Sequence, residues 1–310
     1  MLLKNEILLS NEIPKILSPM MDVIFKLLMG TEGSKDLLTD FLLAVLNLSP
    51  EEYEDITIAN PFLLQEYKGD KLGILDVKLK LKTGKIINVE VQVDPMPFME
   101  SRILFYVSKL ITEQMKESDQ YEQIKRVISI IITGHPLIKQ GKKYHHRFGL
   151  YDIESGILLT DALEIHTLEV PKARKVFGDT VTDTDTGAND ANTNTSADDT
   201  NTKNINLLNW MKFFDIKTEE ELKMLAEKSP TMEKATLRLM ELSADEKARQ
   251  LYEARLKEQR DGYARESGAR QDERFIIAKN MLADNEPFDR IIRYTGLSHE
   301  EIKNLQNADL

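Results

Sequence analysis

Two carboxylates, Asp76 and Glu90, occupy facing positions in a predicted hairpin, and this pair is where the chain could first do chemistry. The stretch 74–94 alternates apolar and polar residues on both sides of a Gly-containing turn, a pattern typical of two antiparallel strands. A three-residue loop, 82–84, puts Gly84 at the left-handed position that such loops favour and sets Asp76 directly opposite Glu90. A two-residue loop would put the two acids on opposite faces, because a slip of one residue turns a strand over.

Opposed carboxylates repel each other, and a bound divalent cation is a common remedy. Mg²⁺ is typically held by one or two carboxylates together with water and substrate phosphates. The hairpin alone leaves a second interpretation open, in which its polar face is solvated and Lys78 or Lys80 neutralises an acid by a diagonal contact. We favour the three-residue register, since it also gathers the Leu and Val side chains of both strands on one face.

The segments around the hairpin predict an α/β fold. Helix patterns cover three ranges: 18–30, 34–46 and 99–116. Strand patterns outside the hairpin cover four ranges: 56–58, 127–133, 144–151 and 162–170. The range 127–133 is continuously apolar and β-branched, as in a strand that is buried on both faces. Because helices flank the strands along the chain, we expect a mixed sheet covered by helices.

Short motifs stand in a fixed order along the chain: Asp22-Val23-Ile24-Phe25-Lys26, Asp76, Glu90-Val91-Gln92, Ser101–Tyr106 and Thr295–Ile302. Each motif is weak alone. Together, their order and spacing resemble the PD-(D/E)xK nuclease superfamily, and within it the recombination-promoting nuclease/transposase family. The resemblance covers most of the chain outside 178–204. It implies a restriction-endonuclease-like α/β core, with a mixed sheet flanked by helices, and a C-terminal all-helical tail.

The resemblance also implies a site for hydrolysis of phosphodiester bonds, with four catalytic residues: Asp22, Asp76, Glu90 and Gln92. Asp76, Glu90 and the backbone carbonyl of Val91 would hold Mg²⁺ or Mn²⁺, and Asp22 would add a direct or water-mediated contact. Gln92 stands where the superfamily has Lys, so it brings hydrogen bonds but no positive charge. Lys78, on the same strand face as Asp76, is a candidate substitute cation. Without the resemblance, Asp22 fits equally well as an acid that complements a helix dipole.

Contacts to substrate phosphate are expected from a second set of residues: Lys26, Lys78, Arg102 and Tyr106. Arg102 and Tyr106 share one side of the helix over 99–116, and a guanidinium suits a phosphate. The alternative is a solvated face with an aromatic cover. His145 and His146 lack a further ligand at metal-site spacing, so a small basic loop, or a plain surface loop, is expected around them.

Composition divides the chain into four expected regions: a nuclease-like domain at 1–177, a disordered low-complexity linker or insertion at 178–204, a helix docking on the core at 205–217, and a helical tail at 218–310. Charges of both signs alternate in the tail, which indicates a solvated or self-associating helix. Ser298 with Glu301 forms a capping box near its end. We therefore expect a homo-oligomer contact through the tail.

The net charge indicates which kinds of partner the protein is suited to bind. The chain carries −11 in total; residues 1–177 hold 22 basic and 25 acidic side chains, a net of −3, so most of the acidity lies outside the expected catalytic region. This balance counts against a high-affinity, sequence-independent DNA binder and less against an enzyme that recruits Mg²⁺. The sequence has no cysteine, which fits a cytoplasmic protein, and no apolar run of signal-peptide or membrane-spanning length.

The expected function is that of a Mg²⁺-dependent DNA endonuclease, with DNA as its partner and no membrane. The alternative is a non-catalytic module that keeps the nuclease fold and acts through its helical tail. The acidic balance and Gln92 favour that alternative, whereas acids facing each other have no use in an inactive site. A third interpretation, an α/β domain that binds a nucleotide, lacks any Gly-rich phosphate loop.

Overall fold

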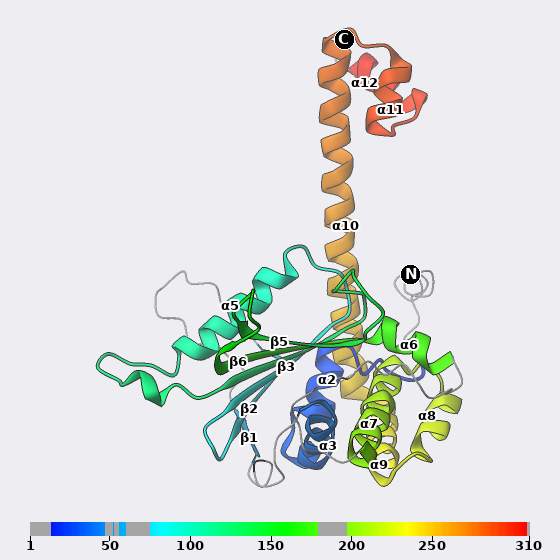
Figure 1. The fold of residues 1–310 in the computed structure, drawn as a ribbon. Helices are drawn as coiled ribbons and strands as arrows, with labels where there is room; N and C mark the ends of the chain where they lie inside the picture. The colour runs from blue at the N-terminus through cyan, green and yellow to red at the C-terminus, as the bar shows by residue number, and fades with distance from the viewer. Residues whose placement is uncertain (1–13, 47–51, 53–55, 60–74, 179–196, 309–310) are drawn as a thin grey trace. The chain divides into compact units, whose positions relative to one another are not determined.

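A mixed sheet of six strands lies at the centre of the part of the chain that the computed structural model describes, residues 14–46, 52, 56–59, 75–178 and 197–308 (Figure 1). The strands are β1 (Ile56–Ala59), β2 (Val77–Leu81), β3 (Ile86–Gln92), β4 (Val127–Thr133), β5 (His145–Tyr151) and β6 (Leu158–Glu169). Their order across the sheet is β1-β2-β3-β4-β6-β5. The pairs β3–β4 and β4–β6 are parallel, and the outer pairs are antiparallel, so the expected mixed sheet is confirmed.

The central strand β4 follows the predicted range 127–133 and is buried along its whole length. Its residues pair with Ile86–Gln92 of β3 on one side and with Leu163–Glu169 of β6 on the other. Helices cover both faces of this part of the sheet, so neither face of β4 meets solvent. That is why five of its seven residues are apolar and β-branched and do not alternate with charged ones, with Ser129 and Thr133 as the buried polar exceptions.

The β2–β3 hairpin has the three-residue register that the sequence predicts. Val77 pairs with Val89, and the Leu81 amide donates to the Lys85 carbonyl at 2.9 Å. Gly84 lies in the left-handed region with φ +86°, where a side chain would be strained. Continued by one residue, this register sets Asp76 opposite Glu90, as the sequence analysis expects.

Helix α5 (Met99–Thr112) covers one face of the sheet (Figure 1). Its inward side chains, Ile103, Val107 and Leu110, share an apolar cluster with Val127 and Ile131 of β4. Alternate residues of a strand point to one side, so Glu90 lies on the same face of β3 as Ile86, the face that α5 covers. The polar side chain of Glu90 therefore lies under a helix and not in open solvent.

Helices α2 (Asp22–Met29) and α3 (Lys35–Val45) lie on the opposite face, and a short 3₁₀ turn, η1 (Glu32–Ser34), joins them. One side of α2 is fully buried and consists of Ile24, Phe25, Leu28 and Met29. The remaining side carries Asp22 and Lys26, four residues apart, which are both half-buried. Burial of the apolar side therefore fixes the rotation of α2 and the direction of these two charged residues.

Helix α7 (Ala197–Asp215) adds an aromatic cluster to this layer. Trp210 packs edge-on against Phe41 of α3 with ring centroids 5.6 Å apart, and its Nε1 donates to Asp40 at 2.8 Å. Phe214 reaches Phe25 of α2 at 6.1 Å. Three further helices complete the layer: α6 (Val170–Gly178), α8 (Glu219–Ala226) and α9 (Pro230–Ala244). Together these contacts hold α2 firmly beneath the sheet.

Two helix ends differ from the predicted ones. Helix α2 begins at Asp22 and not at Pro19, because Ser18 and Pro19 form a turn in which the Met21 amide donates to the Ser18 carbonyl at 3.1 Å. The predicted stop at Gly30 is confirmed, and its amide donates to the Lys26 carbonyl. Helix α5 ends at Thr112 and not at residue 116, since the chain continues in turns and Ser118 takes a left-handed conformation with φ 75°.

The chain divides into two compact units at Tyr252 and Glu253, within the long helix α10 (Glu246–Ala283). The second unit contains α11 (Phe288–Thr295) and α12 (His299–Ala308), whose core is Ala278, Ile291, Leu297 and Ile302. The predicted capping box is present: the Ser298 amide donates to Glu301 at 2.7 Å, and the Glu301 amide donates to Ser298 Oγ at 3.2 Å. Among the described residues, no helix combines the length and apolarity needed to cross a membrane.

Candidate active site at the β2–β3 hairpin and α2

Asp76 and Glu90 meet at the end of the hairpin where β2 begins. Asp76 Oδ2 accepts a hydrogen bond from the Val91 amide at 3.0 Å, which fixes this carboxylate beside the residue that follows Glu90. The Asp76 side chain is 13% exposed, and Glu90 as a whole is 6% exposed. The hairpin therefore holds two acids close together with little access to water.

Burial dominates the protonation of both acids. It raises the pKa of Glu90 to about 7, and the charge of Asp76 adds to this, whereas the Asn88 amide hydrogen bond and Arg102 lower it. Burial also raises the pKa of Asp76, opposed by the Val91 amide and by Lys26. Acids with raised pKa values in a shared site are typical of functional positions, because a positive ligand restores their charge.

The cation beside Asp76 is Lys26 of α2. Its Nζ lies 3.2 Å from Asp76 Oδ1, and its side chain is 37% exposed. Lys78, the cation expected from the sequence, instead pairs with Glu113 just beyond α5, where both side chains are nearly buried. Sequence spacing cannot find the Lys26 contact, because Lys26 and Asp76 are 50 positions apart and meet only when α2 packs on the sheet.

Asp22 lies one helical turn before Lys26 and contributes negative charge to the site. Its charge raises the pKa of Asp76, which places Asp22 within electrostatic reach of the hairpin acids. In the described part of the chain, no group of three or more acidic or histidine side chains is gathered closely enough to hold a metal ion. The arrangement here is two carboxylates with a third at longer range, which fits Mg²⁺, an ion that keeps several waters and needs only one or two carboxylates.

Gln92 and Val91 extend the site along β3. Gln92 is half-buried, and its Nε2 donates to the backbone carbonyl of Asp94 at 3.0 Å, so this amide is turned along its own strand. The contact that Val91 makes is through its amide, which donates to Asp76. The roles expected for the Val91 carbonyl and for Gln92 remain predictions.

Arg102 and Tyr106 approach Glu90 from α5. The Arg102 guanidinium lies over the Tyr106 ring, 4.9 Å from its centroid, and its charge lowers the pKa of Glu90. Arg102 Nη1 donates to Met96 Sδ at 3.6 Å, while Nε is buried and has no hydrogen-bond partner among the described residues. Burial raises the pKa of Tyr106. A buried donor without an acceptor costs free energy, so this nitrogen is suited to an anionic ligand.

Asn88 is a site residue that the sequence analysis does not identify. Its Nδ2 donates to Glu90 Oε1 at 3.0 Å and approaches Ser129 Oγ at 3.4 Å. The spacing in the sequence could have indicated this contact, since Asn88 and Glu90 are two residues apart on one strand and so share a face.

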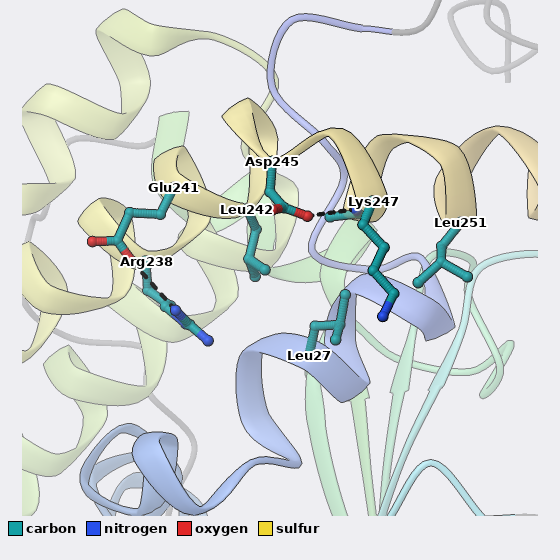
Figure 2. A pocket seen from close by; sticks show the side chains of 8 residues that line it. Leu27, Arg238, Glu241, Leu242, Asp245, Lys247 and Leu251 are labelled. Atoms are coloured by element: carbon teal, nitrogen blue, oxygen red, sulfur yellow. Dashed lines mark hydrogen bonds and ion pairs between the residues drawn. The ribbon is translucent and has the colours of Figure 1, made fainter.

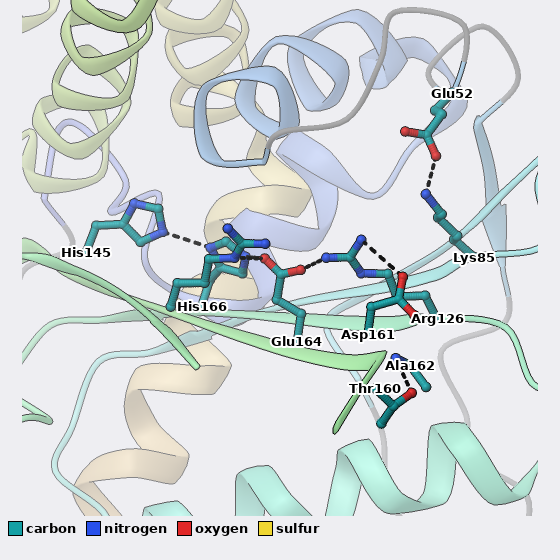
Figure 3. Close-up of polar contacts among 10 residues, drawn as sticks. Glu52, Lys85, Arg126, His145, Thr160, Asp161, Ala162, Glu164 and His166 are labelled. Carbon is teal, nitrogen blue, oxygen red and sulfur yellow. Dashed lines mark hydrogen bonds and ion pairs between the residues drawn. The ribbon is translucent and has the colours of Figure 1, made fainter. Parts of the chain in front are cut away.

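His145 and His146 do not lie in a loop, because both belong to strand β5. His145 Nε2 and His166 Nδ1 are 2.8 Å apart, and His166 Nε2 is 2.7 Å from Glu164 (Figure 3). Glu164 also pairs with Arg126 and Arg147. This polar network faces α2 and α3, across the sheet from Glu90, and the sequence could not reveal it because β6 supplies its buried members.

A shallow pocket lies where α2, α9 and the start of α10 meet, lined by Leu27, Arg238, Glu241, Leu242, Asp245, Lys247, Ala248 and Leu251 (Figure 2). Three of its charged groups have local partners: Arg238 pairs with Glu241 at 3.3 Å, and Asp245 accepts from the Ala248 amide at 2.7 Å. None of the candidate catalytic residues lines this pocket. It is therefore separate from the hairpin site.

A known protein family matches most of the chain. A family model described as PD-(D/E)XK nuclease family transposase matches residues 19–268, which is most of the chain. The chain belongs to this family. Searches of curated proteins and of solved structures gave no match.

Membership in the PD-(D/E)XK nuclease family transposases assigns a nuclease-type function and the corresponding α/β fold. The family name writes the motif as Pro-Asp followed, further along the chain, by an acid, any residue and Lys. This chain supplies Leu75-Asp76 and then Glu90-Val91-Gln92, so it departs from the named motif at Leu75 and at Gln92. In this PD-(D/E)XK nuclease the lysine that contacts Asp76 comes from α2, as Lys26, and the charge of Arg102 acts on Glu90 from α5.

Proposed function

We propose that this PD-(D/E)XK nuclease is a DNA endonuclease that requires Mg²⁺ or Mn²⁺. Asp76, Glu90 and the Val91 carbonyl would hold the ion, with Asp22 contributing directly or through water. The observation that carries the proposal is the pair of nearly buried carboxylates, Asp76 and Glu90, set opposite each other by the hairpin register. A bound divalent ion supplies Lewis acidity toward the scissile phosphate and lowers the pKa of a water molecule.

Lys26 takes the part of the absent motif lysine in this proposal. Its ammonium pairs with Asp76 Oδ1 at 3.2 Å. A divalent ion on Asp76 would compete with that contact, because both cations use the same carboxylate. Lys26 is more than a third exposed and has a long flexible stem, so it is able to turn toward a substrate phosphate or an attacking water.

Arg102 and Tyr106 would position the substrate strand. Arg102 Nε, which has no hydrogen-bond partner in the part of the chain that the structure describes, is suited to a phosphate oxygen, and the Tyr106 ring lies 4.9 Å from the guanidinium carbon. Lys78 is less suited to this role than expected, because Glu113 already neutralises it. Gln92 would orient water or phosphate by hydrogen bonds once its amide leaves the Asp94 carbonyl.

The non-catalytic alternative retains two arguments, the net charge of −11 and Gln92 at the position of the motif lysine. The two functions are separated by incubating supercoiled plasmid with the full chain in Mg²⁺, in Mn²⁺ and in EDTA, alongside Glu90→Gln. The proposal expects nicking that depends on the metal and is lost in the variant. Absence of cleavage in both metals, or equal cleavage by Glu90→Gln, would support the interaction module instead.

A DNA substrate also suits the expected cytoplasmic location.

The same proposal includes self-association through the tail at 218–310. It also includes the division of the chain at 177, 204 and 217. In the structure the first compact unit extends to Tyr252, so α8 and α9 pack with the nuclease core. Size-exclusion chromatography with light scattering would measure the oligomeric state directly.

A further inference from the structure

Asn88 is a fully buried amide on the face of the sheet that α5 covers, among side chains that are mostly apolar. It lies on β3 two residues before Glu90, and its neighbours across the sheet are Lys78 on β2 and Ser129 on β4. The same layer, under α5, is built from apolar side chains such as Ile86 and Ile131. An aliphatic residue would be the ordinary choice at such a position, so the amide calls for an explanation.

The contacts of Asn88 point to Glu90. Nδ2 donates to Glu90 Oε1 at 3.0 Å, and the second contact, to Ser129 Oγ, is longer at 3.4 Å. The other polar atom, Oδ1, is buried without a hydrogen-bond partner among the described residues. An unpaired buried acceptor costs about 1–3 kcal/mol, so Asn88 lowers stability compared with an aliphatic residue unless its donor bond is needed.

We propose that Asn88 is a positioning residue that holds Oε1 of Glu90 and so directs the other oxygen, Oε2, to the divalent cation. The inference rests on the proposed metal-dependent function and assigns a role to a residue outside the nuclease motif. Among the described residues, the hydrogen bond to the Glu90 carboxylate comes from Asn88 alone, and Oε1 accepts it. Oε2 is therefore the oxygen that remains for a ligand.

This arrangement resembles the outer shell of other metal sites. Hydrogen-bond partners of a ligating carboxylate fix its orientation, and their loss typically weakens metal affinity by about 10–100-fold. Here the fixed element is a strand in the middle of the sheet, so Asn88 and Glu90 cannot move independently. A side chain held in one rotamer before the ion arrives loses less entropy when it binds.

The test replaces Asn88 by Leu, which has a similar volume but no donor. Binding of Mn²⁺ alone, without DNA, is measured by electron paramagnetic resonance of the free ion, and the free energy of unfolding is measured in urea. The inference expects about 10–100-fold weaker Mn²⁺ binding with a urea midpoint that is unchanged or higher. Saturating Mg²⁺ should then restore cleavage, because the defect lies in affinity. If Asn88→Leu is too large to fold, Asn88→Val carries the same test.

Ser129→Ala is the matched control. It removes the longer contact of Asn88 and keeps the bond to Glu90, so Mn²⁺ affinity should change little. Wild-type Mn²⁺ affinity in Asn88→Leu, together with weak binding by Glu90→Gln, would overturn the role of Asn88 and leave the proposed nuclease intact. A wild-type chain that neither binds Mn²⁺ nor cuts DNA would overturn both.

Discussion

The substitution Glu90→Gln should make the metal-free protein more stable at pH 8 while it removes nuclease activity. Glu90 is 6% exposed, and burial raises its pKa from the ordinary 4.5 to about 7. Above pH 7 the folded chain must therefore keep a charge in a poorly solvated position, close to the charge of Asp76. A glutamine keeps the shape and accepts the same hydrogen bond from Asn88, but it carries no charge.

The magnitude follows from the pKa difference. A pKa that moves from 4.5 in the unfolded chain to about 7 in the folded chain corresponds to about 3 kcal/mol. Because the folded pKa is the higher one, the contribution of Glu90 to the free energy of unfolding is fully present below pH 4.5 and is lost as the pH rises to 7. The glutamine side chain in Glu90→Gln would be neutral at every pH. The free energy of unfolding of Glu90→Gln should therefore exceed that of wild type only slightly at pH 4 and by about 3 kcal/mol at pH 8.

The assay is urea unfolding of both proteins in EDTA between pH 4 and pH 8. The quantity of interest is the difference in free energy of unfolding, which cancels the titration of all other groups. Glu117→Gln, at an exposed position after α5, is the matched control and should show no such pH-dependent difference. A difference for Glu90→Gln that is the same at pH 5 and pH 8, or a loss of stability at pH 8, would refute the reasoning.

Three further predictions concern neighbouring residues. Lys26→Met should lower the single-turnover cleavage rate by about 10²-fold. It should lower the free energy of unfolding in urea by less than about 1 kcal/mol, since the ion pair of Lys26 with Asp76 is partly exposed; an unchanged cleavage rate, or a loss of activity explained by unfolding, would contradict this. Arg102→Lys should weaken DNA binding by about tenfold or more in Ca²⁺ titrations, because Lys has no Nε donor; unchanged binding would count against a phosphate contact. Gly134→Ala should destabilise the fold by about 1–3 kcal/mol, since a Cβ would meet the Val93 carbonyl oxygen at 2.8 Å; a neutral thermal midpoint would contradict it.

Local pattern was sufficient to predict the hairpin and the central strand. Alternation and the Gly84 loop fix the register, because only one loop length puts the apolar residues of both strands on one face. The range 127–133 was predicted without error, since no other element of this length is so uniformly apolar. These features depend on neighbours in sequence, which a single chain displays directly.

Contacts between distant segments could not be predicted in the same way. The sequence offers Lys78 as the cation for Asp76, because the two lie on one strand, yet Lys78 pairs with Glu113 and Lys26 arrives from α2. The choice is made by the packing of α2 through its apolar side, which pattern alone does not place on the sheet. The same holds for His145, whose partner His166 comes from a neighbouring strand.

The solvation of the site was also outside the reach of the sequence. An alternating strand suggests a wet polar face, but α5 covers that face of β3, and Asn88 and Glu90 are both buried. Burial raises the pKa of Glu90 and gives Asn88 its importance. The sequence predicts that α5 exists, but the burial of Glu90 and Asn88 depends on where α5 lies on the sheet.

The most direct test of the account is cleavage of supercoiled plasmid by the full chain in Mg²⁺ and in EDTA, with Asp76→Ala and Asp36→Ala compared at equal purity. Asp36 is the matched control, since it also pairs with a lysine, Lys234, but lies on α3. We expect nicking in Mg²⁺ by wild type and Asp36→Ala, and none in EDTA or by folded Asp76→Ala. Cleavage by Asp76→Ala at the wild-type rate would contradict the assignment of the active site to the hairpin.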